Sequence, residues 1–149
     1  MKKETDPRMH SAEHILNQTM VRMFNCNRSF NAHIEKKKSK CDYHLGHALT
    51  EREINRIEKQ VNTVIEADLP IAEEYQSREI AQEQYNLNRL PPDTGDDIRI
   101  VRIGDYDACP CIGSHVSSTK EIGTFRIVST SFDSGVLRVR FRLGQSKAP

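Results

Sequence analysis

The end of the chain alternates apolar and basic residues, and this pattern constrains the fold more than any other feature. The alternation occupies residues 136–143. A period of two is typical of a strand with one buried face, which places the apolar side chains in a core and the basic ones in solvent. The apolar set comprises Leu137, Val139, Phe141 and Leu143, and the basic set comprises Arg138, Arg140 and Arg142.

Two amphipathic helices are expected before most of the strands. The first covers about residues 7–24, with Asp6 as its cap and Pro7 at a position that needs no backbone donor. The second begins after Thr50, which can form a capping box with Glu53, and it ends before Pro70. Both segments carry apolar residues at helical spacing, so each should pack one face against the sheet.

The remaining elements are shorter. Strands are expected at residues 71–75, 98–103 and 124–129, a short helix at 77–85 and a loop at 90–95. Residues 29–45 are interpreted as two short strands joined by a lysine-rich turn. Because helices and strands are segregated, the sequence predicts one α+β domain over residues 1–149, with an antiparallel sheet packed with two main helices.

Composition excludes several classes of protein. The chain has 149 residues and a formal net charge of +1, so it is not a strongly basic nucleic-acid binder. No stretch approaches the roughly 20 apolar residues that a membrane crossing needs, and the first residues lack a secretory signal. The four cysteines are therefore expected to be reduced thiols or metal ligands in a cytoplasmic protein.

Two short motifs offer metal ligands. His10 and His14 are four residues apart on the first predicted helix, so both imidazoles can reach the same point. Cys111 and His115 have the same interval between two predicted strands. Three nitrogens and one sulfur suit tetrahedral zinc, and the two motifs together predict a zinc site.

Other interpretations of these motifs stay open. A histidine pair at this spacing also occurs by chance, and buried free cysteines are usually core residues. Residues 10–14 also match the inverted zinc-peptidase pattern, in which Glu13 would activate a water, although Glu13 could equally orient a ligand imidazole. Cys109 could replace Cys111 as a ligand or form a redox pair with it, but only Cys111 keeps the four-residue interval to His115.

In these two motifs the chain resembles the editing domain of alanyl-tRNA synthetases, and in particular its stand-alone form, the short AlaX type of trans-editing protein. The resemblance covers nearly the whole chain and is weakest at residues 29–43 and 85–97. It is carried by residues 10–16, by residues 49–54 running on to 67–71, and by 115–116 followed by 118–123. The residues between Cys111 and His115, Ile-Gly-Ser, depart from the Gly-Gly-Thr usual in the synthetase-linked form.

The resemblance implies a hydrolase that deacylates mischarged seryl-tRNA for alanine, with glycyl-tRNA removed by some members. It implies that His10, His14, Cys111 and His115 are the zinc ligands and the catalytic residues. Editing domains of threonyl-tRNA synthetases share these motifs, so seryl-tRNA for threonine is an alternative substrate. A non-catalytic zinc domain that binds tRNA or protein is the other alternative. The oligomeric state is not indicated.

An editing site of this kind must recognise a hydroxyl group. A small alanine pocket rejects serine poorly, whereas a second site that hydrogen-bonds the hydroxyl discriminates in the opposite direction. The family places such a residue shortly after the first helix, where this chain offers Ser29 or Asn31. Of the two, we expect Ser29 rather than Asn31 to recognise the hydroxyl group.

Four protein ligands would make a closed zinc site, whereas zinc hydrolases keep a position open for water. Either one ligand is loose, or the coordination expands, or the ion only positions the substrate. The working hypothesis is that the aminoacyl group is held at the ion while water attacks the ester carbonyl.

Phosphate contacts require local positive charge. One candidate patch lies in the turn and comprises Lys36, Lys37, Lys38 and Lys40; the other is the arginine face of the last strand, Arg138, Arg140 and Arg142. The modest net charge predicts a weak, salt-sensitive affinity for tRNA.

Overall fold

The computed structural model describes residues 6–88, 90–91 and 94–145. Pro92 and Asp93 of the expected loop lie outside these residues. The described chain forms three α-helices, a 3-10 turn and two antiparallel sheets. The elements in chain order are α1 (Pro7–Phe24), β1 (Asn31–His33), β2 (Ser39–His44), α2 (Glu51–Glu66), β3 (Ile71–Ser77), α3 (Arg78–Gln84), β4 (Asp97–Ile103), β5 (Asp107–Pro110), η1 (Thr119–Ile122), β6 (Phe125–Asp133) and β7 (Val136–Leu143).

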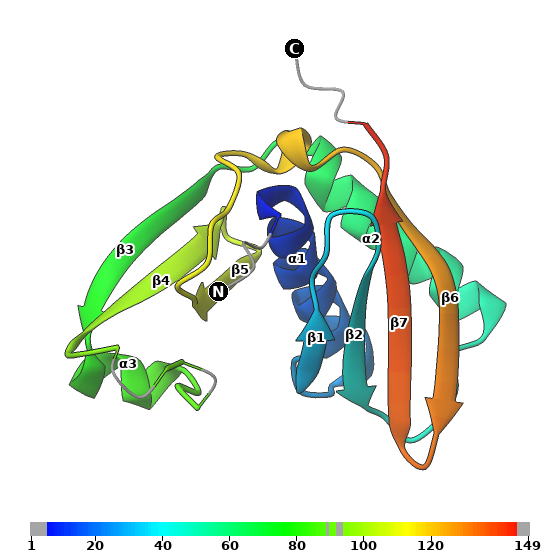
Figure 1. The fold of residues 1–149 in the computed structure, drawn as a ribbon, viewed down its shortest axis with the longest axis horizontal. Helices are drawn as coiled ribbons and strands as arrows, with labels where there is room; N and C mark the ends of the chain where they lie inside the picture. Colours follow the sequence, from blue (N-terminus) through cyan, green and yellow to red (C-terminus); the bar gives the residue numbers. More distant parts are fainter. Residues whose placement is uncertain (1–5, 89, 92–93, 146–149) are drawn as a thin grey trace.

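The larger sheet has the strand order β1-β2-β7-β6, and the smaller one has the order β3-β4-β5. Helix α1 lies between the two sheets, and α2 packs beside it against the larger sheet (Figure 1). The predicted α+β class is confirmed, but the strands form two sheets instead of one. Strand β5 was not predicted, because Asp-Ala-Cys-Pro has neither alternation nor β-branched residues.

Both main helices begin where the sequence predicts. The Asp6 side chain accepts a hydrogen bond from the backbone of Met9, and Pro7 stands at the first helical position. Thr50 and Glu53 form the expected reciprocal capping box at the start of α2. The cap at Asp6 fixes the start of α1, whose first turns carry the histidine pair.

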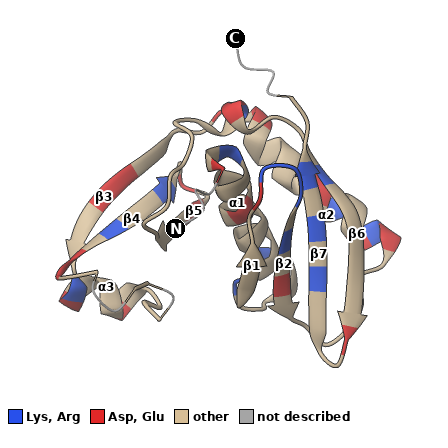
Figure 2. Ribbon diagram, in the orientation of Figure 1, with Lys and Arg blue, Asp and Glu red and all other residues tan. Residues whose placement is uncertain are grey.

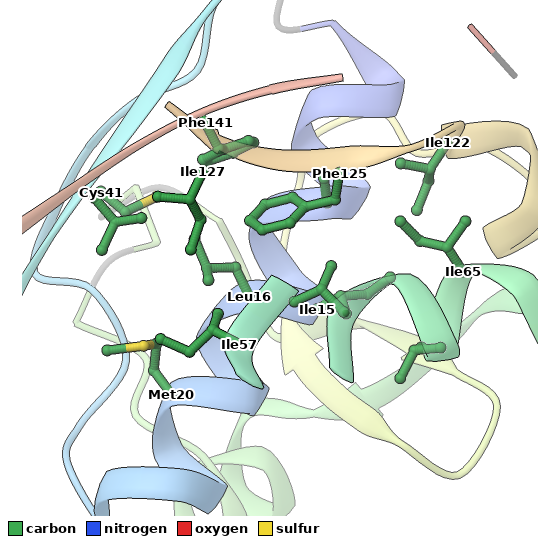
Figure 3. Close-up of a cluster of buried hydrophobic side chains, with 14 of the residues drawn as sticks. Ile15, Leu16, Met20, Cys41, Ile57, Ile65, Ile122, Phe125, Ile127 and Phe141 are labelled. Carbon is green, nitrogen blue, oxygen red and sulfur yellow. The ribbon is translucent and has the colours of Figure 1, made fainter. Parts of the chain in front are cut away.

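The principal core fills the space between the two helices and the larger sheet. Figure 3 shows Ile15 and Leu16 of α1 beside Ile57 of α2, with Phe125 and Phe141 of the sheet above them. All five side chains are buried. The alternation in β7 is confirmed, since Leu137, Val139 and Phe141 are inside and the arginines are partly or fully exposed.

The smaller sheet has a minor core of its own. Ala81 of α3 packs there with Ile98 and Ile100 of β4. This sheet reaches α1 through β5, and the loop that follows β5 carries the second metal-ligand motif. None of the helices in the described part of the chain is long and apolar enough to cross a bilayer.

Candidate metal centre

The structure brings the two motifs together. His10, His14, Cys111 and His115 each offer one donor atom, and the four atoms lie within 4.8 Å of one another. The histidine pair comes from α1, whereas the other two residues come from the loop after β5. Residues about 100 positions apart in the chain therefore converge on one point that could hold a metal ion.

Helical spacing places the first two imidazoles side by side. The ring centroids of His10 and His14 are 5.0 Å apart, and the His115 ring stacks on His10 at 4.2 Å. The Nε2 atom of His10 lies 3.3 Å from the sulfur of Cys111. Three imidazoles thus surround one thiol, as the two sequence motifs predict.

The opposite edge of each imidazole meets a polar partner. The Nδ1 atom of His10 lies 3.2 Å from the backbone carbonyl of Ser114, and Nδ1 of His115 lies 3.0 Å from the hydroxyl of Ser11. The Nδ1 atom of His14 faces the carboxylate of Asp107 at 3.6 Å. Partners at Nδ1 fix the ring orientation of metal-binding histidines and leave Nε2 as the donor.

Asp107 is itself held in place from two directions. Its carboxylate accepts hydrogen bonds from the Arg28 guanidinium at 2.7 Å and from the Gln18 amide at 2.9 Å. Burial opposes its ionisation, but the adjacent His14 imidazole and the hydrogen-bonded Arg28 guanidinium outweigh burial and lower the pKa of Asp107 to about 2. Asp107 is therefore a fixed carboxylate beside His14.

The charges of the cluster favour a cation at its centre. Burial raises the pKa of the Cys111 thiol, but its contact with His10 and the nearby imidazoles of His115 and His14 outweigh burial and lower that pKa to about 3. Burial lowers the pKa of His14, but the nearby negative groups of Asp107 and Cys111 outweigh burial and raise that pKa to about 9. A thiolate and a carboxylate thus flank His14 and stabilise positive charge there.

A donor atom of the cluster that lacks a hydrogen-bond partner also suits a metal ion. Within the described chain, Nε2 of His115 is buried and has no hydrogen-bond partner. Burial lowers the pKa of His115 to about 4, so its imidazole is neutral near pH 7 and can offer a lone pair to a metal ion. A buried lone pair facing a thiolate is costly without a cation, and a thiolate with imidazoles is a donor set that suits zinc.

Cys109 is in a different environment from Cys111. Burial raises the pKa of its thiol to about 11, and its sulfur contacts the backbone carbonyl of Pro110. It is absent from the group of four converging donors in the described residues. The geometry therefore favours Cys111 as the ligand, in agreement with the spacing to His115.

The two residues expected to recognise a hydroxyl group lie on different sides of the larger sheet. Ser29 is buried, and its backbone amide donates to the side chain of Asn17 on α1. Asn31 is exposed and donates to Asp42, which binds Arg138 on the outer sheet face. Ser29 is thus the one that lies beside α1, and the role of each stays a prediction.

The two predicted basic patches form one surface. Strand β2 pairs with β7 so that Lys40 is opposite Arg140, and Lys36, Lys37 and Lys38 are exposed in the turn beside them. Figure 2 shows this positive charge along β7 and in the loop between β1 and β2. Two arginines also stand opposite each other, Arg126 and Arg142. Like charges directly opposite destabilise a sheet, and an anionic ligand would relieve that cost.

Arg138 differs from its neighbours. Its guanidinium makes two hydrogen bonds to the Asp42 carboxylate, at 2.8 and 3.0 Å. The side-chain hydrogen bonds from Arg138 lower the pKa of Asp42. Arg138 is therefore largely neutralised, whereas Arg140 makes a long contact of 3.4 Å with Ser129 and no carboxylate contact among the described residues.

A further basic surface was not singled out from the sequence. A cavity of about 490 Å³ between α1 and α2 is lined by Arg22, Arg56 and Lys59, together with Tyr106. The Arg22 guanidinium lies over the Tyr106 ring, 4.1 Å from its centroid. The basic residues come from separate helices and have no common sequence motif.

Sequence reasoning also missed the partners that orient the histidines. Asp107 gives no periodic signal, but it stands four residues before Cys111, and carboxylates commonly bind the second nitrogen of a metal ligand histidine. Ser11 lies inside the first motif, where only its role was overlooked. Arg28 lies in the segment after the first helix, where the sequence pattern indicates only a break between elements.

Comparisons with known proteins agree with this geometry. Residues 98–140 match the family described as "Threonyl and Alanyl tRNA synthetase second additional domain". The chain is 33% identical over 141 residues to an alanine–tRNA ligase of Fervidobacterium nodosum. The aligned region is 93% of this chain and 16% of the ligase. It is 31% identical over 139 residues to an alanine–tRNA ligase of Bacillus subtilis, and the aligned region is 91% of this chain and 16% of that ligase. The chain thus spans about one sixth of the length of these relatives.

The fold, the four converging donors and these matches define the class of synthetase-associated additional domains that threonyl- and alanyl-tRNA synthetases share. Within this class, the chain belongs to the alanyl-tRNA synthetase editing-domain family and is an AlaX-like editing domain.

Proposed function

We propose that this protein is a cytoplasmic trans-editing hydrolase that deacylates seryl-tRNA for alanine, with glycyl-tRNA as a second substrate, at a zinc site. The observation that carries the proposal is the convergence of His10, His14, Cys111 and His115 within 4.8 Å. The relatives named above are alanine–tRNA ligases, which favours alanine over threonine tRNA. Attack of water on the ester carbonyl would release serine and free tRNA.

The proposed zinc ligands are Nε2 of the three histidines and the sulfur of Cys111. When bound, zinc would supply positive charge to polarise the ester carbonyl and stabilise the developing oxyanion. Ser114, Ser11 and Asp107 hold the imidazole rings in the orientation that this requires. The His10 side chain is 13% exposed and that of His14 only 5%, so substrate would approach over His10.

In this proposal Ser29 reads the serine hydroxyl, with Asn31 as the less favourably placed candidate. The tRNA backbone would lie on the basic surface formed by the lysine turn and β7. Arg140, Arg142 and Lys40 would contribute most, because Arg138 is already bound to Asp42. The remaining turn lysines, Lys36, Lys37 and Lys38, are exposed beside them.

The test is deacylation of purified seryl-tRNA for alanine, with seryl-tRNA for threonine as the comparison. We expect zinc-loaded protein to hydrolyse the alanine tRNA ester faster, and chelated protein that is still folded to lose that activity. Cys111→Ala should abolish activity, and Cys109→Ala is the matched control. Equal activity after chelation would show that the metal has no catalytic role, and protection of the ester would indicate a non-catalytic binding domain.

A further inference from the structure

We infer that Glu13 forms a subsite for the α-ammonium group of the aminoacyl ester. This inference rests on the proposed function, because it concerns the substrate of the same site. It begins from a buried carboxylate at the centre of the first motif that the four proposed ligands do not include.

Glu13 lies directly beside the metal-binding cluster. It is three residues after His10 on α1, and its Oε1 atom is 3.7 Å from Nε2 of His10, the nitrogen that faces Cys111. Its side chain is 7% exposed, and that of His10 is 13% exposed. The carboxylate therefore borders the side of the cluster from which substrate would approach.

The carboxylate has no permanent cationic partner in the described part of the chain. Its ion-pair contact is with His10, whose Nδ1 atom donates to Ser114 and whose Nε2 atom must be unprotonated to bind a metal. Arg28 acts on Glu13 through space but directs its hydrogen bonds to Asp107. A buried carboxylate without a paired cation is costly, and a cationic ligand would remove that cost.

The substrate brings the missing charge. An aminoacyl ester carries an α-amino group, which is largely protonated near neutral pH. A divalent ion with one thiolate and three neutral imidazoles keeps a net charge of about +1, which repels an ammonium group brought near it. A carboxylate beside the cluster would offset that repulsion and hold the ammonium group while the ester carbonyl approaches the ion.

The surroundings of Glu13 place this subsite near the predicted hydroxyl reader. Asn17 is one helical turn beyond Glu13, and its side-chain oxygen accepts hydrogen bonds from the Ser29 backbone amide and the Tyr43 hydroxyl. The amino group and the hydroxyl of a seryl ester are on adjacent carbons, so their binding groups must be on the same side of the site. Glu13 and Ser29 fit that requirement, since Glu13 is one helical turn before Asn17 and the Ser29 amide donates to Asn17.

The consequence is discrimination against blocked amino groups. A seryl ester whose nitrogen carries an acyl group has a neutral amide in place of the ammonium. Glu13 would then be left unpaired by the bound ligand, so the site should reject N-acylated and peptidyl esters in favour of free aminoacyl esters.

The experiment compares two stable amide analogues of the tRNA terminus by calorimetry on zinc-loaded protein. One is 3′-(L-serylamino)-3′-deoxyadenosine, and the other is the same compound without its α-amino group. We expect wild-type protein to bind the amino compound about tenfold more tightly. Glu13→Gln should bind both equally, whereas Glu66→Gln, an exposed position on α2, should keep the preference. Zinc content and circular dichroism verify that each variant is loaded and folded.

Equal binding of the two compounds by wild-type protein overturns the inference, and this arm does not depend on any variant folding. If such protein still deacylates seryl-tRNA, the proposed function stands without the Glu13 subsite. If Glu13→Gln keeps the preference but hydrolyses seryl-tRNA more slowly, Glu13 acts in the hydrolytic step instead and the inference is wrong. Absence of both binding and deacylation overturns the proposed function and the subsite together.

Discussion

Individual residues in the second motif are fixed by contact with the first. Gly113 lies so close to His10 that a Cβ atom there would overlap the imidazole ring. Its carbonyl also accepts a hydrogen bond from Arg99 at 2.7 Å, which holds the loop in this position. Only glycine allows the loop to approach the ring this closely.

We therefore expect Gly113→Ala to displace His10 and to lower zinc affinity by about 10- to 100-fold, as the loss of ligand-orienting groups typically does. Competition with a chromophoric chelator measures the affinity, and the deacylation rate should fall with it. Gly46→Ala is the matched control, because nothing lies within 4 Å of the added methyl group. Unchanged zinc affinity in Gly113→Ala would contradict this account of the loop.

At this scale, the sequence predicted the donors but not their supports. The interval of four residues in each motif is a local property, and both intervals are visible in the chain. The contacts from Ser11 to His115 and from Asp107 to His14 join residues far apart, and no local pattern encodes them. The functional roles of the donors stay proposals until they are tested.

Among the elements, strand β7 is the one whose two faces have separate tasks. Its apolar face completes the core, while its arginines border the lysine turn and form the proposed tRNA surface. A competing basic surface lies between α1 and α2 and includes Lys59. The two surfaces can be separated by single substitutions.

We expect Arg140→Ala to weaken tRNA binding across all sequences and to reduce by about one the slope of log affinity against log salt. Lys59→Ala should leave the tRNA affinity and its salt dependence unchanged if the sheet face binds the tRNA phosphates. Fluorescence titrations with tRNA over a range of salt concentrations measure both quantities. The reverse pattern would show that the tRNA binds at the cavity between α1 and α2 instead of on the sheet.

The long elements could be predicted because their periodicity and caps are local. The first helix matches its predicted range of residues 7–24, and the capping box at Thr50 forms as expected. Strand pairing could not be predicted, since periodicity shows which face is buried but not which strand lies beside it. The separation into two sheets and the addition of β5 therefore emerged only from the structure.

Over the whole molecule, Asp107 helps to join the smaller sheet to α1 beside the histidine pair. It stands at the start of β5 in the smaller sheet and binds Gln18 on α1 and Arg28 just beyond it. The smaller sheet has only a minor core of its own. A buried ion pair at this junction therefore contributes both to the docking of the sheet and to the orientation of His14.

We expect Asp107→Asn to lower the free energy of unfolding by about 3 kcal/mol, because it leaves the Arg28 charge without its partner. Zinc affinity should fall as well, since His14 loses its carboxylate. Urea denaturation and chelator competition measure the two effects. Asp105→Asn, at an exposed neighbouring position, is the control. A variant that loses zinc affinity at full stability would limit Asp107 to orienting His14.

The two ligand pairs are about 100 residues apart in the chain, and this has a consequence for the unfolded state. An ion bound by His14 and Cys111 would close a ring of about 100 residues, much as a covalent crosslink does. By the loop-entropy relation, a crosslink of that span restricts the unfolded chain by about 4–5 kcal/mol. Catalysis and conformational durability would then depend on the same four side chains, so a substitution that removes one would weaken both at once.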